Sequence, residues 1–151
     1  VFPVVKDAMA RRLEFFNSPN FIPIMVWLLT SQRKKFFRWF DSGDVQNIFM
    51  ALNILEVCRL TPDIKHWIPS KEYKIWRQVL KIQKLPDNVV LRMSSPNVDQ
   101  APLTGFENTS TVHKNKKAFG LECIAYKQDG KCLDCKACYF KKVKNVSYPI
   151  H

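Results

Sequence analysis

Apolar side chains recur at helical spacing along the first part of the chain. Between residues 4 and 16 they fall on one helical face, at Val5, Ala8, Met9, Leu13 and Phe16. This spacing predicts an amphipathic helix. Ser18 and Pro19 then form an N-cap and first-turn pair, which predicts a second and more buried helix that ends near residue 32.

Short apolar runs then alternate with longer helical stretches. The pattern predicts strands over 36–40, 64–68 and 89–93, and helices over 45–60 and 71–83. An Asp41-Ser42-Gly43-Asp44 turn precedes the first of these helices, and Ser42 or Asp44 is its expected cap. Strands that alternate with helices favour parallel β-α-β units with right-handed crossovers. The predicted fold class is therefore α/β, either a partial parallel barrel or an open sheet.

This alternation stops after residue 94. Residues 95–118 carry Pro96, Pro102 and Gly105 and show no sustained periodicity. A loop of this length in a compact domain is usually functional or mobile. A last strand is expected within residues 145–150.

The length of 151 residues fits one domain that buries a core without metal support. We expect a single domain over 1–151, with an α/β core (1–94) and a loop and cysteine-cluster tail (95–151) packed on it. The longest apolar run, residues 21–29, is interrupted by Pro23 and is shorter than the roughly 20 residues of a membrane span. We therefore expect a soluble protein without a membrane partner.

Four cysteines near the C-terminus carry the strongest chemical signal. Cys123, Cys132, Cys135 and Cys138 follow the spacing C-x8-C-x2-C-x2-C. Thiolates bind metal, and a C-x2-C-x2-C run brings three of them together in one short loop, with a fourth available from just upstream. We therefore predict a cysteine-rich metal-binding loop in which all four cysteines are ligands.

The spacing favours a [4Fe–4S] cluster over zinc. A zinc ion needs four ligands at about 2.3 Å around one point, usually from two separated C-x2-C pairs, whereas an iron–sulfur cube accepts thiolates at several corners. Zinc stays as the alternative. Disulfides are a third interpretation, which needs an oxidising compartment and fits poorly with five cysteines and no recognisable secretory segment.

Positive charge is concentrated around these cysteines. The chain carries 24 Lys plus Arg against 13 Asp plus Glu, a net charge of +11, and residues 112–151 hold nine lysines and three acidic residues. Ammonium groups stabilise an anionic cluster and raise its reduction potential. They also attract a nucleic acid or another anionic partner, and composition leaves both interpretations open.

Aromatic side chains lie among the same lysines, at Tyr126, Tyr139, Phe140 and Tyr148. A surface for single-stranded nucleic acid combines aromatic stacking with charge in this way, and so does an apolar shell that keeps water from a cluster. The tryptophans recur within predicted helices and strands and are expected mostly in the core; they are Trp27, Trp39, Trp67 and Trp76.

Several residues outside the cysteine segment have structural interpretations. Cys58 falls among leucines late in the helix over 45–60, as a small buried apolar residue does. His66 lies on a predicted strand, where a neutral and hydrogen-bonded core histidine is expected. Asp41 and Asp44 lie where a strand passes into a helix, the edge at which parallel α/β folds place their sites, although capping also explains them.

Arg38 and Arg92 occupy the interiors of two predicted strands. They are expected either to face the mouth of a barrel and bind an anion, or to pair with Asp41 or Asp99. His113 lies in the lysine-rich loop without a nucleophile near it in the sequence, so no catalytic Ser/His/Asp or Cys/His spacing is present.

Three motifs in order carry a resemblance to a known family. They are the Asp41-Ser42-Gly43-Asp44 turn, the Val98-Asp99-Gln100-Ala101-Pro102 segment, and the ending that runs from Cys132-Leu-Asp-Cys135-Lys-Ala-Cys138 to Asn145-Val-Ser-Tyr-Pro149-Ile-His151. With these motifs the chain resembles the phage gene-product-eighty-eight family. The similarity covers nearly the whole chain, including the opening Phe2-Pro3-Val4-Val5-Lys6.

The resemblance implies a partial barrel of parallel strands, similar to that of radical S-adenosylmethionine enzymes, with cysteines that hold an iron–sulfur cluster. It also implies a location in the cytoplasm of the infected host cell. A radical enzyme needs a three-cysteine loop that leaves one iron open, and no such loop precedes Phe36 in this chain. Four C-terminal ligands would leave a cube fully ligated, which suits electron transfer, sensing or structure rather than substrate activation.

We therefore expect a phage-encoded iron–sulfur protein that binds one [4Fe–4S] cluster through the four cysteines, with a redox or regulatory role during infection. The first alternative is a basic nucleic-acid-binding module stabilised by a structural zinc. The second is a remnant of a radical-S-adenosylmethionine-like enzyme, for which a cofactor at the strand ends near Asp41, His66 and Arg92 would be the sign.

Overall fold

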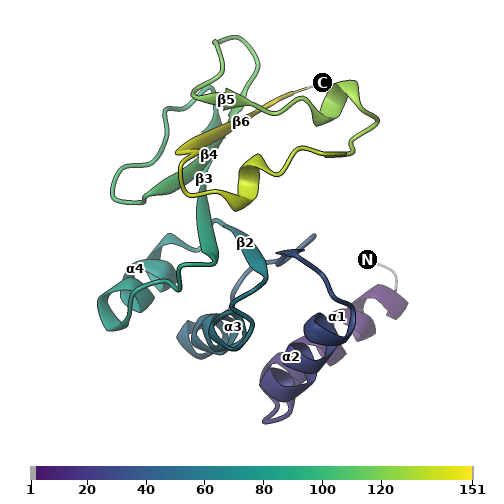
Figure 1. The fold of residues 1–151 in the computed structure, drawn as a ribbon. Helices are drawn as coiled ribbons and strands as arrows, with labels where there is room; N and C mark the ends of the chain where they lie inside the picture. Colours follow the sequence, from purple (N-terminus) through teal and green to yellow (C-terminus); the bar gives the residue numbers. More distant parts are fainter. Residues whose placement is uncertain (1–2, 151) are drawn as a thin grey trace.

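Within residues 3–150, the part of the chain that the computed structural model describes, six parallel strands form one curled sheet, an open half-barrel (Figure 1). The strands are β1 (Phe36–Arg38), β2 (Lys65–Ser70), β3 (Val89–Val98), β4 (Asn108–His113), β5 (Leu121–Glu122) and β6 (Asn145–Pro149). Their order in the sheet is β1-β2-β3-β4-β6-β5, and each neighbouring pair is parallel. The predicted α/β class with a partial parallel barrel is confirmed.

Four α-helices of the described residues cover one part of this sheet. They are α1 (Pro3–Phe16), α2 (Phe21–Ser31), α3 (Ile48–Leu60) and α4 (Tyr73–Ile82). Figure 1 shows them gathered below β1, β2 and β3, whereas the long C-terminal connections lie beside β4, β5 and β6. Helices and strands share one buried apolar core, whose members include Ile54, Leu55, Ile68, Trp76, Leu91 and Met93.

The helix α2 is almost entirely apolar in sequence but has only 11 residues. No helix in the described range 3–150 is long and apolar enough to cross a membrane. The helix starts after Asn20, so the prediction of Ser18 as its cap is wrong. Trp27 on this helix is 66% exposed, contrary to its expected core position, whereas Trp39, Trp67 and Trp76 are buried as expected.

The prediction of a loop without secondary structure over 95–118 is wrong. Strand β4 lies in this range and pairs with β3 and β6 near the centre of the sheet. Buried parallel strands usually consist of apolar residues, but β4 is polar at most positions and therefore shows no hydrophobic alternation. Hydrogen bonds satisfy its buried side chains: Thr109 Oγ1 donates to Asn145 Oδ1 at 2.7 Å, and Thr111 Oγ1 donates to Ser147 Oγ at 3.0 Å.

The N-terminus of α3 is capped by Asn47, not by the predicted Ser42 or Asp44. Asn47 Oδ1 accepts a hydrogen bond from the N–H of Met50 at 2.8 Å. Because an N-cap satisfies an amide that the helix leaves unpaired, Asn47→Ala should lower the free energy of unfolding by about 1 kcal/mol. Urea denaturation measures this loss. Asn47→Asp keeps an acceptor oxygen and should stay close to the wild type; an alanine variant equally close to it would rule out the cap.

Candidate metal centre

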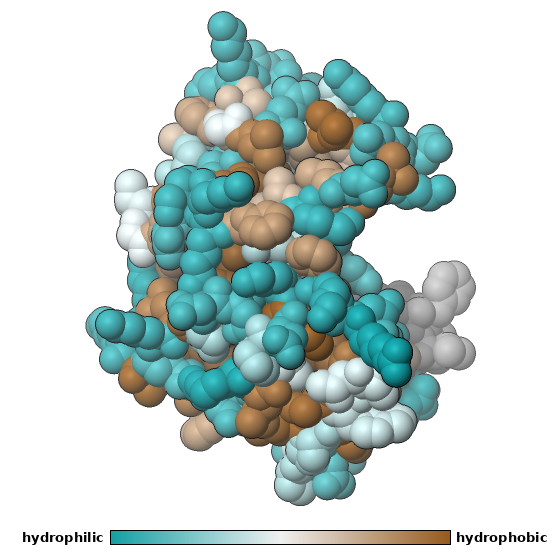
Figure 2. All heavy atoms as spheres, in the orientation of Figure 1, coloured by the Kyte–Doolittle hydropathy of each residue, from teal (hydrophilic) through white to brown (hydrophobic). Residues whose placement is uncertain are grey.

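All four predicted ligands line one cavity inside the half-barrel. Cys123, Cys132, Cys135 and Cys138 border a cavity of about 200 Å³. The other walls are formed by strands β1, β2, β5 and β6 and by the cysteine loop, and include Phe36, Arg38, Trp67, Leu121, Tyr139 and Val146. Side chains alternate between the two faces of a strand, so Trp67 lies on the face opposite to Ile68 of the helical core. Figure 2 shows the surface hollowed between the C-terminal loops and the helical part.

A different local structure holds each part of the cysteine segment. The N–H of Cys123 continues the pairing of β5 with β6 by donating to a β6 carbonyl oxygen at 2.8 Å. Cys132 and Cys135 flank a turn in which the N–H of Cys135 donates to the carbonyl of Cys132 at 2.8 Å. Cys138 lies in the short 3-10 helix η2 (Ala137–Tyr139), which contacts β2 and β3. Residues far apart in the chain thus reach one cavity.

Tyr139 fixes η2 against the sheet. Its ring lies 5.1 Å from that of Phe36 and 5.8 Å from that of Trp67, both in edge-to-face geometry, and such pairs add about 0.5–1.5 kcal/mol beyond the burial of their area. The Tyr148 hydroxyl lies 3.7 Å from Cys138 Sγ. Of the two roles expected for these tyrosines, the contacts favour a shell around the cysteines.

The four cysteines line the cavity without forming a recognisable metal site. In the described part of the chain, no group of three or more His, Cys, Asp or Glu side chains is placed to hold a single metal ion. The cysteines are free thiols, with Cys132 and Cys135 exposed and Cys123 and Cys138 partly buried. The described residues therefore place four thiols around one cavity, but the predicted cysteine-rich metal-binding loop is not shown.

Cys138 is the most strongly perturbed thiol of the cavity. Burial raises the pKa of Cys138; a hydrogen bond from Tyr148 and the charge of Arg92 oppose this rise, while Cys123 and Cys132 add to it. Burial also raises the pKa of the Tyr148 hydroxyl. Thiols in this position ionise when a metal cation replaces their protons.

Two buried hydrogen-bond donors beside these cysteines have no acceptor among the described residues. They are Trp67 Nε1 and Arg92 Nε. Trp67 lines the cavity, and Arg92 is 0% exposed. A buried donor without an acceptor costs about 1–3 kcal/mol. Sulfide and thiolate sulfurs accept hydrogen bonds, so the indole N–H of Trp67 fits an anionic, sulfur-containing group in the cavity. Arg92 does not line the cavity and lies behind its wall.

Two cationic side chains border the same cavity. The guanidinium of Arg38 lies 4.7 Å from the ring centre of Trp67, and the ammonium of Lys136 lies 5.9 Å from that of Phe36. Arg38 also approaches Asp41 at 3.7 Å, one of its expected partners, but both side chains are well exposed and the pair is weak. Together with the acidic Glu122, they leave one net positive charge on the cavity lining, which favours an anionic occupant.

Cys58 and His66 belong to the core, as predicted. His66 Nδ1 accepts from Trp39 Nε1 at 3.3 Å, and its Nε2 lies 2.8 Å from Thr61 Oγ1. Because Thr61 Oγ1 itself donates to the carbonyl of Val57, we assign the ring proton to Nε2. Burial lowers the pKa of His66 to about 4 and raises that of Cys58 to about 12. Both side chains are therefore neutral structural groups.

The carboxylates at the strand ends bind the main chain. Asp44 accepts a hydrogen bond from the N–H of Lys71 at 2.6 Å, which ties the connection before α3 to the end of β2. Asp99 accepts from the N–H of Lys114 at 2.8 Å, and this bond lowers the pKa of Asp99. In the described range, neither Asp41 nor Asp99 pairs with Arg92, so that expected ion pair is wrong.

Ser147, His113 and Glu122 form an arrangement that resembles a catalytic triad and that the sequence did not indicate. Ser147 Oγ lies 2.7 Å from His113 Nδ1, and His113 Nε2 lies 3.9 Å from a Glu122 carboxylate oxygen. Ser147 is fully buried and accepts a hydrogen bond from Thr111. A hydroxyl that no substrate can reach is not a nucleophile, so this group stabilises β4 and β6.

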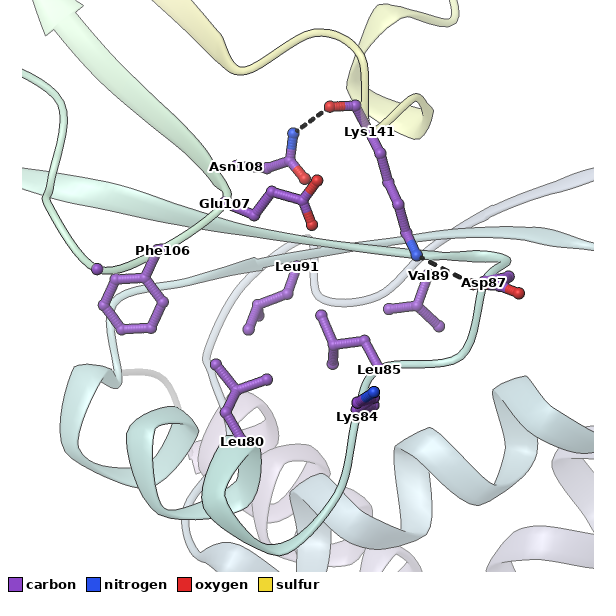
Figure 3. A pocket seen from close by; sticks show the side chains of 11 residues that line it. Leu80, Lys84, Leu85, Asp87, Val89, Leu91, Phe106, Glu107, Asn108 and Lys141 are labelled. Carbon is purple, nitrogen blue, oxygen red and sulfur yellow. Dashed lines mark hydrogen bonds and ion pairs between the residues drawn. The ribbon is translucent and has the colours of Figure 1, made fainter.

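A larger cavity of about 380 Å³ lies away from the cysteines, at the start of β3 and β4 (Figure 3). Its apolar lining includes Leu80, Leu85, Val89, Leu91 and Phe106. Lys141 crosses it to pair with Asp87 at 3.6 Å, and the Lys141 carbonyl accepts from Asn108 Nδ2 at 2.9 Å. No thiol lines this cavity, and Lys141 already has a partner. Its contacts anchor the segment that follows Cys138.

A protein-family model matches most of the chain. It is described as Gene product 88 and matches residues 1–145, a range that includes the four cysteines of the cavity. No curated protein and no solved structure matches the chain.

Proposed function

The chain belongs to the phage gene product 88 family, and we propose that it is an iron–sulfur protein that binds one [4Fe–4S] cluster in the cysteine cavity. Cys123, Cys132, Cys135 and Cys138 would each supply one thiolate. The observation that carries the proposal is that all four side chains line the same cavity inside the half-barrel. A cube with four protein thiolates has no open iron for a substrate, so a redox or regulatory role during infection is favoured over radical catalysis.

The residues around the cavity have separate tasks in this proposal. A bound cluster would supply one-electron chemistry. Phe36 and Tyr139 exclude water from its inner side, because their rings pack against each other and against the sheet. The exposed Cys132 and Cys135 bring its outer edge close to solvent, where a one-electron donor or acceptor can approach.

We also propose that the protein works in the cytoplasm of the infected host cell. That compartment keeps thiols reduced, and the described cysteines are all free thiols. A cytosolic site of action is compatible with cluster ligation, since thiolates and not disulfides are the ligands.

The proposal is tested by purifying the full chain without oxygen. We expect a brown protein with broad absorption near about 400 nm that bleaches when dithionite is added, because thiolate-to-iron charge transfer gives this band. A colourless protein with one equivalent of zinc would contradict the proposal and support a structural zinc site.

A second candidate is a basic nucleic-acid-binding module held together by zinc. The observation in its favour is that lysines lie over exposed aromatic rings near the cavity: Lys127 is 5.3 Å from the ring centre of Tyr126, and Lys142 is 5.8 Å from that of Phe140. Single-stranded nucleic acid is bound by such mixed surfaces. Tight binding of a labelled single-stranded oligonucleotide that weakens steeply with salt would favour this candidate.

A further inference from the structure

Arg92 is a buried cation without a carboxylate partner. Its Nη1 donates to the carbonyl of Thr109 at 2.8 Å and its Nη2 to that of Val143 at 3.1 Å, and no Asp or Glu of the described residues forms an ion pair with it. The side chain is 0% exposed. A buried charge without a counter-charge is strongly destabilising, so an anion near Arg92 is expected in the working protein.

The position of Arg92 points to the cysteine cavity as the place of that anion. Arg92 pairs with Pro69 in the register of β2 and β3, which puts it on the same face of the sheet as Trp67, two residues earlier in β2. The helix η2, which carries Cys138, contacts β3. Arg92 does not itself line the cavity. It lies behind the lining residues, on the face of the sheet that borders the cavity.

Trp67 provides a second buried hydrogen-bond donor without an acceptor. It lines the cavity, and its indole N–H is buried without an acceptor, as is the Nε–H of Arg92. Tryptophan usually finds a hydrogen-bond partner when it is buried. A donor in the cavity wall and a buried cation behind that wall indicate that the occupant carries both hydrogen-bond acceptors and negative charge.

We propose that Arg92 is the counter-charge and Trp67 a hydrogen-bond donor of the cluster, and that together they raise its reduction potential; this inference rests on the proposed function. The reduced cluster carries one more negative charge than the oxidised cluster. A nearby cation and N–H donors to sulfur therefore stabilise the reduced form more than the oxidised form. The bound cluster also supplies the negative counter-charge that Arg92 lacks, so cluster binding should stabilise the fold.

The test uses the full chain reconstituted with ferrous iron and sulfide and titrated potentiometrically. We expect Arg92→Gln and Trp67→Phe to shift the reduction potential to more negative values. Arg92→Lys keeps the charge and should shift it less than Arg92→Gln. The matched control is Arg59→Gln, because Arg59 lies on α3 and pairs with Glu56, and its potential should equal that of the wild type.

Thermal unfolding separates this role from a purely structural one. If Arg92 only clamps the carbonyls of Thr109 and Val143, Arg92→Gln and Arg92→Lys will lose stability alike while potentials stay unchanged, which would overturn the inference. Where Arg92→Gln does not fold, Trp67→Phe decides. A wild-type chain that takes up no iron overturns the proposed function as well, whereas an iron-loaded wild type with unchanged potentials in the variants overturns this inference alone.

Discussion

Replacing Cys135 with alanine is expected to remove most of the iron from the protein while leaving the fold intact. Cys135 is exposed and borders the cavity, so its substitution removes a ligand without opening a hole in the core. Because loss of a group that only supports a ligand already costs 10–100-fold in metal affinity, loss of the ligand itself should reduce cluster occupancy by at least about tenfold. Iron content and absorption near about 400 nm measure the loss.

Cys58→Ala is the matched control for this experiment. Cys58 is buried in the helical core and does not line the cavity. The control should keep its iron, although it loses some stability to the smaller side chain. Equal iron in Cys135→Ala and the wild type, or equal loss from Cys58→Ala, would show that the cavity cysteines do not hold the metal. Circular dichroism verifies that both variants are folded.

Lowering the pH from about 6.5 to about 4 is expected to reduce the free energy of unfolding by about 3 kcal/mol through His66 alone. Burial holds the pKa of His66 near 4 in the folded protein, below the ordinary value of 6.5. As the pH falls through this window, the unfolded chain binds a proton that the folded chain does not, so the unfolded state gains stability. The stabilising contribution of neutral His66 is fully present above pH 6.5. It is lost as the pH falls towards the folded pKa, and no further stability is lost through His66 below that pKa.

Urea denaturation across this pH range, carried out on the wild type and on His66→Gln, isolates the effect. Glutamine does not ionise in this pH range. Its side chain still offers a donor and an acceptor to Thr61 and Trp39, the two partners of His66. Acid also protonates other groups in both proteins. The free energy of unfolding is plotted against pH for each protein, and the difference between the two slopes is due to His66. Parallel slopes would show that His66 takes up protons in the folded state as readily as in the unfolded state.

The parts of the fold that depend on neighbouring residues follow from the sequence. The spacing of apolar residues locates β1, β2, β3 and the helices between them, because burial on one face dictates both strand and helix periods. The C-x2-C-x2-C run likewise predicts that its three cysteines lie near one another, and all three line one cavity. The final strand also agrees, with 145–150 expected and Asn145–Pro149 observed.

The parts that depend on distant contacts do not follow from local pattern. Strand β4 is polar, and its buried side chains find hydrogen-bond partners on β3, on β6 and in the segment before β6. The cap of α3 is Asn47 because the helix starts three residues later than its apolar pattern indicates. The unpaired states of Trp67 and Arg92 become visible only when the strands are in register and the cysteine segment lies across them.

Quantifying iron, acid-labile sulfide and zinc in the same anaerobically purified sample tests the central claim most directly. Four thiols around one cavity predict about four iron and about four sulfide per chain, with little zinc. About one zinc per chain without sulfide, or no bound metal, would contradict the assignment of an iron–sulfur protein.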